Sequence, residues 1–309
     1  MPFLFSKYCI IFNCYPESIT MFKYLFFTLL LFVSTLTFAQ QDHSVLLKWK
    51  LKPGEIITYK TVLKNIDSAS SFSMGNFFKG SGADSANSAQ ADKTLKELRG
   101  AMENNNYVTT LTENKPGLID IVMRGSNDEK PIIADTSKSD GDQRKFKALM
   151  KQVTAGVMLR GQITEAGLIT SFYLKSDQKN LITALFELPG KPVKVGDSWP
   201  VEVNFISMDQ NFVCDTSYKK NSVTVISITN INGDQIVKLK YDIVEYANGY
   251  FNSPFDGKNI NTSIKFSHKG TADFSLNQGR WLDYNCIMST FSTGLMSNQS
   301  TETISLLNN

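Results

Sequence analysis

Residues able to do acid–base, nucleophilic or metal chemistry are few in this chain of 309 residues. Only two histidines occur, His43 and His268, and the second lies in an alternating segment typical of a strand. These positions favour neither a Ser–His–Asp triad nor a metal site built on several histidines. The motifs G-x-S-x-G, H-E-x-x-H, the phosphate-binding loop and paired C-x-x-C are all missing. The sequence therefore nominates no catalytic residue, no cofactor and no metal ligand.

Acidic residues give one local cluster, Asp135, Asp140 and Asp142. It lacks the Asp-x-Asp-x-Asp-Gly spacing of a calcium loop, and Lys138 occupies a ligand position. We therefore expect a loop that caps the helix after it. Paired carboxylates for glycoside hydrolysis need no local motif, so a hydrolase with unrecognised carboxylates stays an alternative.

The N-terminal segment has the layout of an export signal. Lys23 precedes an apolar run from Leu25 to Val33, and Ala39 offers the small residue that a signal peptidase needs. The run is shorter than the roughly 20 apolar residues of a membrane span. We predict that residues 1–39 are a signal peptide, with Met21 as an alternative start of translation. The mature protein would be periplasmic or secreted, without a transmembrane span.

Two cysteines follow the predicted cleavage site, Cys214 and Cys286. Disulfides form and persist in exported proteins. Each cysteine shares an alternating face with apolar residues, so we expect both to point inward and to form a disulfide. Two buried free thiols are the alternative.

The charge of the chain is nearly balanced, with a formal net charge of +3. A protein that binds nucleic acid needs a strongly basic face to neutralise phosphates. We therefore expect no nucleic-acid partner.

The dominant hydrophobic period of the chain is two. Apolar side chains alternate with polar ones at 45–51, 199–205, 237–243 and 272–276, and turn signals such as Asn232-Gly233-Asp234 separate such runs. This pattern is typical of antiparallel strands with one buried face. The sequence predicts a mainly β fold of antiparallel sheets, with two or three amphipathic helices packed on the sheet.

Two segments resemble each other. Both Leu51–Tyr59 and Leu188–Phe205 place a glycine and an acid, Gly54-Glu55 and Gly196-Asp197, just before an aromatic and β-branched run. Hairpins are expected in the same order after each. The chain is thus interpreted as two tandem, similar halves, although hairpins at such intervals also occur by chance in β-rich proteins.

The predicted halves are residues 40–190 and residues 191–309. The first carries an excess of residues, part of which is the stretch Ser68–Ala91, rich in Ser, Gly, Ala and Asn. Such a stretch has too little apolar content to pack, so we predict a long loop.

Helices are expected mainly in the first half, at 143–154 and 177–187, with a third at 92–104. Each of the first two carries an apolar stripe at helical spacing. The opposite face of 143–154 is basic, which suits a solvated face or an anionic membrane surface.

The chain resembles an uncharacterised family of exported Bacteroidota proteins. The resemblance rests on K-P-V-K-V-G-D-S-W at Lys191–Trp199, a G-x-I-x-x-x-G hairpin at Gly161–Gly167, and G-T-A-D-F-S-L-N-Q-G-R-W at Gly270–Trp281. It implies a location in the cell envelope and a β-rich fold. The family is a domain of unknown function, so it supplies no catalytic or binding residues.

Three classes of function follow: a non-catalytic carrier of an apolar or lipid-like ligand, an envelope protein that binds other proteins, and the hydrolase mentioned above. The halves form either a sandwich of two sheets or one curved sheet with the helices as a lid. A lid predicts an enclosed apolar cavity of at least roughly 300 Å³. Its expected lining residues are Phe146, Leu149, Met150, Leu181 and Leu185.

Overall fold

A computed structural model describes residues 44–66, 71–73, 106–125, 157–173, 176–207, 210–253 and 257–308. The predicted signal peptide, the loop at 68–91 and the helices at 92–104 and 143–154 lie outside the described residues, apart from 71–73. Twelve strands and one helix make up the described part. Their bounds are β1 (Ile56–Asn65), β2 (Ser71–Ser73), β3 (Asn106–Lys115), β4 (Leu118–Gly125), β5 (Val157–Thr164), β6 (Ile169–Tyr173), α5 (Ser176–Phe186), β7 (Ser198–Pro200), β8 (Phe212–Ile231), β9 (Asp234–Asn252), β10 (Asn259–Ser275), β11 (Arg280–Thr293) and β12 (Ser297–Asn308).

All twelve strands belong to one antiparallel sheet, which confirms the prediction of a mainly β, antiparallel fold. Its order is β6-β5-β4-β3-β1-β12-β11-β10-β9-β8-β7, and the short β2 also pairs with β12. Strands β1 and β3 to β6 form one run of neighbours, and β7 to β12 form the other. The two runs meet where Tyr59 of β1 lies opposite Asn308 of β12.

This topology decides between the two arrangements expected from the sequence. Because both runs share one sheet, the sandwich of two sheets is wrong and the single sheet is correct. The similarity of the two halves stays a prediction. Of the two or three expected helices, α5 is confirmed within the described residues.

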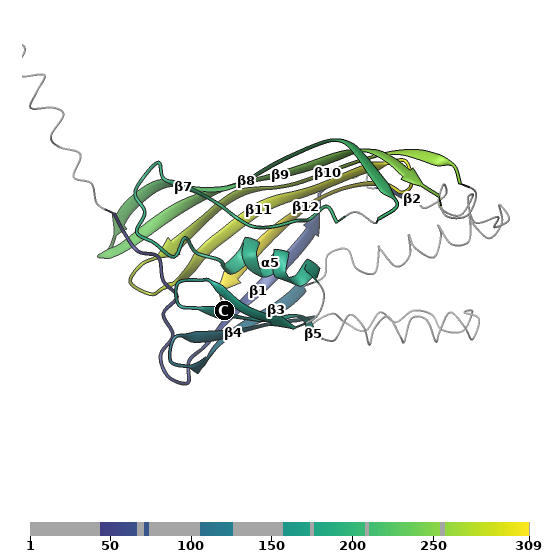
Figure 1. Cartoon of the computed structure of the whole chain (residues 1–309). Coiled ribbons are helices and arrows are strands. Elements are labelled where there is room, and N and C mark those ends of the chain that lie inside the picture. The colour runs from purple at the N-terminus through teal and green to yellow at the C-terminus, as the bar shows by residue number, and fades with distance from the viewer. Residues whose placement is uncertain are drawn as a thin grey trace, which may run out of the picture. The chain divides into compact units, whose positions relative to one another are not determined.

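Helix α5 lies inside the curve of the sheet, as Figure 1 shows. Its last turns are buried on every side, since the consecutive residues Ile182, Thr183, Ala184, Leu185 and Phe186 are each at most 2 % exposed. An amphipathic surface helix would bury one stripe only. The sheet therefore wraps around α5 rather than carrying it on one face.

The turns of the two similar segments, at Gly54 and Gly196, have the same construction. Gly54 and Gly196 adopt positive φ angles of 78° and 90°, which glycine accepts without strain. The carboxylate of Glu55 accepts a hydrogen bond from the backbone N–H of Lys52 at 2.8 Å, and that of Asp197 accepts one from Lys194 at 3.0 Å. Each acid thus closes its own turn just ahead of a strand.

Two segments with alternating apolar residues, which were expected to be strands, are extended but make few of the hydrogen bonds that join strands into a sheet. Residues 45–51 make one isolated β-bridge, between Val45 and Val193. In the segment 199–205 the strand β7 ends at Pro200. The alternation nevertheless predicts burial correctly, because Leu47, Trp49, Val201 and Val203 are all buried. Side-chain packing and scattered hydrogen bonds hold these segments in place of a continuous ladder.

A close approach between strands explains one glycine of the G-T-A-D-F motif. A Cβ atom on Gly270 of β10 would lie 2.1 Å from the carbonyl oxygen of Asn285 and 2.5 Å from the Cα atom of Cys286 on β11. Backbone atoms cannot move aside as a flexible side chain can. Gly270 therefore lets the backbones of β10 and β11 approach closely at this point.

Candidate functional site

The C-terminus of α5 is buried, so its free carbonyl groups need partners. Three aromatic side chains supply them. The indole N–H groups of Trp49 and Trp281 donate to the carbonyls of Phe186 and Leu185 at 3.0 and 2.9 Å, and the Tyr284 hydroxyl donates to Ala184 at 3.2 Å. These donors fix the end of the helix against the sheet.

A buried polar cluster lies behind this cap. The Nε2 atom of His268 is 2.8 Å from the Tyr284 hydroxyl oxygen. Because that hydroxyl donates its own hydrogen to Ala184, His268 must carry its hydrogen on Nε2 and donate it to Tyr284. Burial lowers the pKa of His268 to about 4.

The neighbouring thiol is also neutral. Burial raises the pKa of Cys286 to about 12. A nucleophilic cysteine needs a thiolate and access to substrate. With both Cys286 and His268 only 3 % exposed, this cluster serves to position α5.

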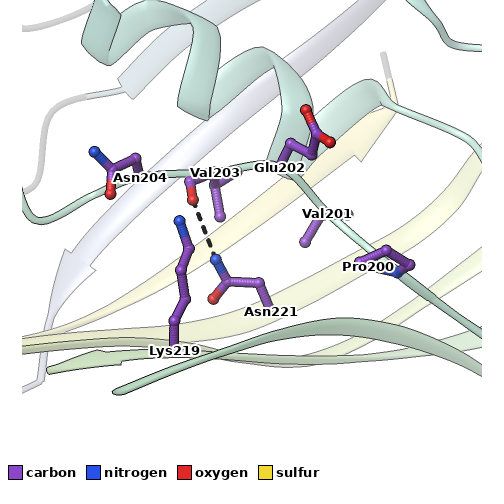
Figure 2. Close-up of a pocket in the computed structure, with 7 residues that line it drawn as sticks. All are labelled: Pro200, Val201, Glu202, Val203, Asn204, Lys219 and Asn221. Atoms are coloured by element: carbon purple, nitrogen blue, oxygen red, sulfur yellow. Dashed lines mark hydrogen bonds between the residues drawn. The ribbon is translucent and has the colours of Figure 1, made fainter. Parts of the chain in front are cut away.

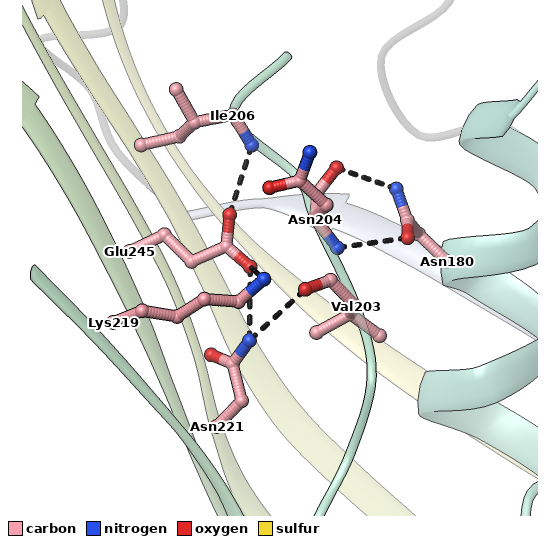
Figure 3. Close-up of polar contacts among 7 residues, drawn as sticks. All are labelled: Asn180, Val203, Asn204, Ile206, Lys219, Asn221 and Glu245. Carbon is pink, nitrogen blue, oxygen red and sulfur yellow. Dashed lines mark hydrogen bonds and ion pairs between the residues drawn. The ribbon is translucent and has the colours of Figure 1, made fainter. Parts of the chain in front are cut away.

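A second polar cluster holds the segment that follows β7, residues 201–207, which we call the strap. Asn180 of α5 donates to the carbonyl of Asn204 at 2.7 Å and accepts from its N–H at 2.9 Å. On the sheet side, Asn221 donates to the carbonyl of Val203 at 3.1 Å, and Glu245 accepts from the N–H of Ile206 at 3.0 Å. Figure 3 shows that these side chains take the place of a neighbouring strand.

Glu245 is the centre of this second cluster. It is 3 % exposed and also accepts a hydrogen bond from the Asn221 amide at 3.0 Å. The Lys219 ammonium lies 3.6 Å from the same carboxylate oxygen. Three donors therefore balance the charge of a buried carboxylate.

A shallow and largely open pocket of about 500 Å³ lies between the strap and β8. Figure 2 shows its lining residues, Pro200, Val201, Glu202, Val203, Asn204, Lys219 and Asn221. The Asn221 amide group is oriented by its two acceptors, Val203 and Glu245, since a flipped amide would set oxygen against oxygen. Its own oxygen is buried without a partner.

Glu187 follows α5 and carries a perturbed carboxyl. Burial, with Glu202 adding a like charge, raises its pKa to about 7, while Lys179 acts in the opposite direction. A carboxyl with a raised pKa beside a second carboxyl is a pairing that acid–base catalysis uses. Glu187 is not among the residues that line the pocket, so the two carboxyls do not face one molecule bound there.

The residues predicted to line an apolar cavity are only partly within the described ranges. Phe146, Leu149 and Met150 lie outside them. Leu185 is 1 % exposed, and Leu181 is half-buried and packs against the core. The pocket between the strap and β8 is lined by other residues, so the predicted cavity stays a prediction.

The predicted disulfide is wrong. Cys214 is an exposed free thiol on β8, and Cys286 is a buried free thiol on β11. Strands β9 and β10 lie between them. The residue of β8 that is in register with Cys286 is Val223, and Cys214 lies nine positions further along β8, a separation of roughly 30 Å. A disulfide needs Cα atoms within about 7 Å.

Comparisons with protein-family models, curated proteins and solved structures find no match to this chain. Within the described ranges, no three histidine, cysteine or acidic side chains gather as they would around a metal ion. No helix in the same ranges is long and apolar enough to cross a membrane.

Sequence reasoning missed Glu245, Asn221 and Lys219, although a signal was present. The inward-facing alternation 237, 239, 241, 243 continues to Glu245, and the inward positions Val225 and Val223 continue to Asn221 and Lys219. A polar residue at an inward position of a strand indicates a buried partner or a site. That break in the pattern could have located the cluster.

Proposed function

We propose that this chain is an exported, non-catalytic protein that binds or carries a small apolar or lipid-like ligand in the pocket between the strap and β8. The pocket carries the proposal, because its volume of about 500 Å³ is in the range of small-molecule sites. Of the residues that line it, Pro200, Asn204 and Lys219 are exposed and can touch a ligand, while Val201 and Val203 are buried beneath it in the core. This mixture suits an amphiphile with an apolar body and a polar head.

The strap gives such a ligand a way in. Its residues beyond Val201 are attached through Asn180, Asn221 and Glu245 rather than through a ladder. Breaking these hydrogen bonds, each worth about 1 kcal/mol net, leaves the sheet intact, but it also exposes the buried Val203 and separates the stacked rings of Phe205 and Phe266. Opening of the strap is therefore an occasional event, during which β8 and β9 stay paired.

Native mass spectrometry of the exported protein tests this proposal. Asn204→Trp fills the pocket from an exposed position whose backbone pairing with Asn180 is kept, and Ser207→Trp is a matched control on the strap outside the pocket. We expect a co-purified small molecule on the wild type and on the control, and its loss from Asn204→Trp. Empty protein in every case, or equal occupancy in both variants, would contradict the proposal.

A protein-binding module in the envelope is the second candidate, and β8 favours it. Residues 213–220 are exposed without interruption, on both faces of the strand. The backbone carbonyl of Asn221 points to the side of β8 on which β7 lies, because it accepts a hydrogen bond from the N–H of Val201. Ser217 is four residues away on the same strand, so its backbone groups point to the same side, beyond the end of β7. A partner strand could add there. If a partner adds a strand at this edge, chemical cross-linking should capture the complex. Ser217→Pro removes one outward N–H and should abolish that complex, while ligand occupancy of the pocket stays unchanged.

A further inference from the structure

A row of lysines stands on the segment at 44–52. Lys48, Lys50 and Lys52 are exposed, and they alternate with the fully buried Leu47 and Trp49. Because the buried side chains fix which side faces the core, the three lysines point the same way, with a spacing of about 7 Å. Lys48 and Lys52 present their charge to solvent, while the ammonium of Lys50 between them donates to the carbonyl of Leu276 at 2.7 Å.

The position of this row is fixed by the fold. The N–H of Trp49 donates to the carbonyl of Glu165 at 2.8 Å, and the N–H of Lys50 donates to that of Gly279 at 3.1 Å. Val45 and Val193 exchange two hydrogen bonds of 2.8 Å. The charges therefore stand on a rigid backbone and lose little freedom on binding.

The bridge at Val45 brings a second basic segment beside the first. Lys191 and Lys194 flank Val193 and are both exposed. Among the described residues, neither Lys48 nor Lys191 has a carboxylate within ion-pairing distance. We call the surface formed by Lys48, Lys50, Lys52, Lys191 and Lys194 the basic end.

Nearby carboxylates offset the charge of the basic end only in part. Glu55 is engaged by the Arg280 guanidinium at 2.7 Å, and Asp197 accepts from the N–H of Lys194. Glu165 remains as an exposed acid beside the row. Glu113, which accepts from the N–H of Gly117, and Asp234, which accepts from Ser275 beside Leu276, lie near the same end. Five lysines and Arg280 stand against these five acids, so the surface keeps a small excess of positive charge.

Exposed aliphatic side chains accompany the lysines. Leu46 is 40 % exposed and Val195 is 55 % exposed, and each lies within two residues of a lysine of the basic end. Lysines bind the phosphates of either a lipid headgroup or a nucleic acid. Aliphatic side chains gain more by entering the region between headgroups and acyl chains, which favours the lipid surface.

We infer that the basic end docks the protein on an anionic membrane surface. Each lysine near such a surface strengthens binding several-fold at ordinary ionic strength, so the row provides reversible attachment. The inference is independent of the pocket and of any ligand in it.

Co-sedimentation of the exported protein with vesicles tests this inference. The vesicles are phosphatidylcholine alone, or phosphatidylcholine mixed with phosphatidylglycerol. The test variant replaces Lys48, Lys52 and Lys191 by Gln, and leaves Lys50, whose ammonium donates to the carbonyl of Leu276. We expect salt-sensitive binding of the wild type to the anionic vesicles only, and a partition coefficient roughly a hundredfold lower for the variant.

A matched control removes the same charge elsewhere. It replaces the exposed Lys64, Lys258 and Lys265 by Gln, and should bind nearly as the wild type does. An equal loss in both variants would mean that only net charge matters, and would overturn the inference. So would equal binding to neutral and anionic vesicles, or binding to duplex DNA in place of anionic vesicles. Circular dichroism and the urea midpoint should be unchanged in both variants.

Discussion

The hydroxyl of Tyr284 joins the sheet to the end of α5, and Tyr284→Phe removes it with little change of shape. The carbonyl of Ala184 then loses its donor, and the Nε2–H of His268 loses its acceptor. Both lie where water does not reach, since Tyr284 is fully buried and His268 is 3 % exposed. An unpaired buried polar group costs about 1–3 kcal/mol. We therefore expect the free energy of unfolding to fall by about 3 kcal/mol.

Urea unfolding, followed by tryptophan fluorescence and extrapolated linearly to water, measures this change. Tyr218→Phe is the control, because the Tyr218 side chain is 49 % exposed on β8; it should change stability by less than about 0.5 kcal/mol. Adding His268→Leu to Tyr284→Phe should cost less than the sum of the single changes, since the two groups share one hydrogen bond. A Tyr284→Phe variant as stable as the control would refute the role assigned to this hydroxyl.

Three further results are expected. Gly270→Ala places a methyl group against the β11 backbone and should lower the free energy of unfolding by about 2–3 kcal/mol, as measured by urea titration; an unchanged midpoint would exclude the close approach. The folded-state pKa of His268 is about 4, so between pH 6.5 and 4 the unfolded chain binds a proton that the folded chain does not. In the Glu187→Gln variant, which lacks a carboxyl of opposite pH dependence, the free energy of unfolding should therefore fall by about 3 kcal/mol over this range. Adding His268→Leu should flatten this dependence on pH. Thiol labelling without reductant should modify Cys214 in the native protein and Cys286 only after unfolding, whereas a protein with no reactive thiol would restore the disulfide.

The parts of the fold that depend on local sequence patterns were predictable. Alternating apolar residues predicted the strands and even the burial of Trp49 outside the ladder, and Gly54 and Gly196 marked their turns correctly. Long-range pairing was not predictable, because alternation gives a strand one buried face but does not name its neighbour. The disulfide failed for this reason, since inward-facing cysteines say nothing about the strands between them. The polar break at Asn221 and Lys219 was visible in the alternation, but the pocket was missed because nothing in the sequence shows that the strap lies over them.

The pairing of β1 with β12 has a consequence for the order in which the protein acquires its structure. The strand in the middle of the sheet, β12, is the last of the twelve along the chain, and its neighbour β1 is the first. Until β12 inserts, β1 and β11 each present an unpaired edge that is free to join other chains. Local hairpins can form during synthesis, but the sheet cannot close before the final strand is available. A chain that stops at Met296 should therefore leave both edges open and aggregate, whereas a complete chain kept unfolded until synthesis ends can close them in a single step.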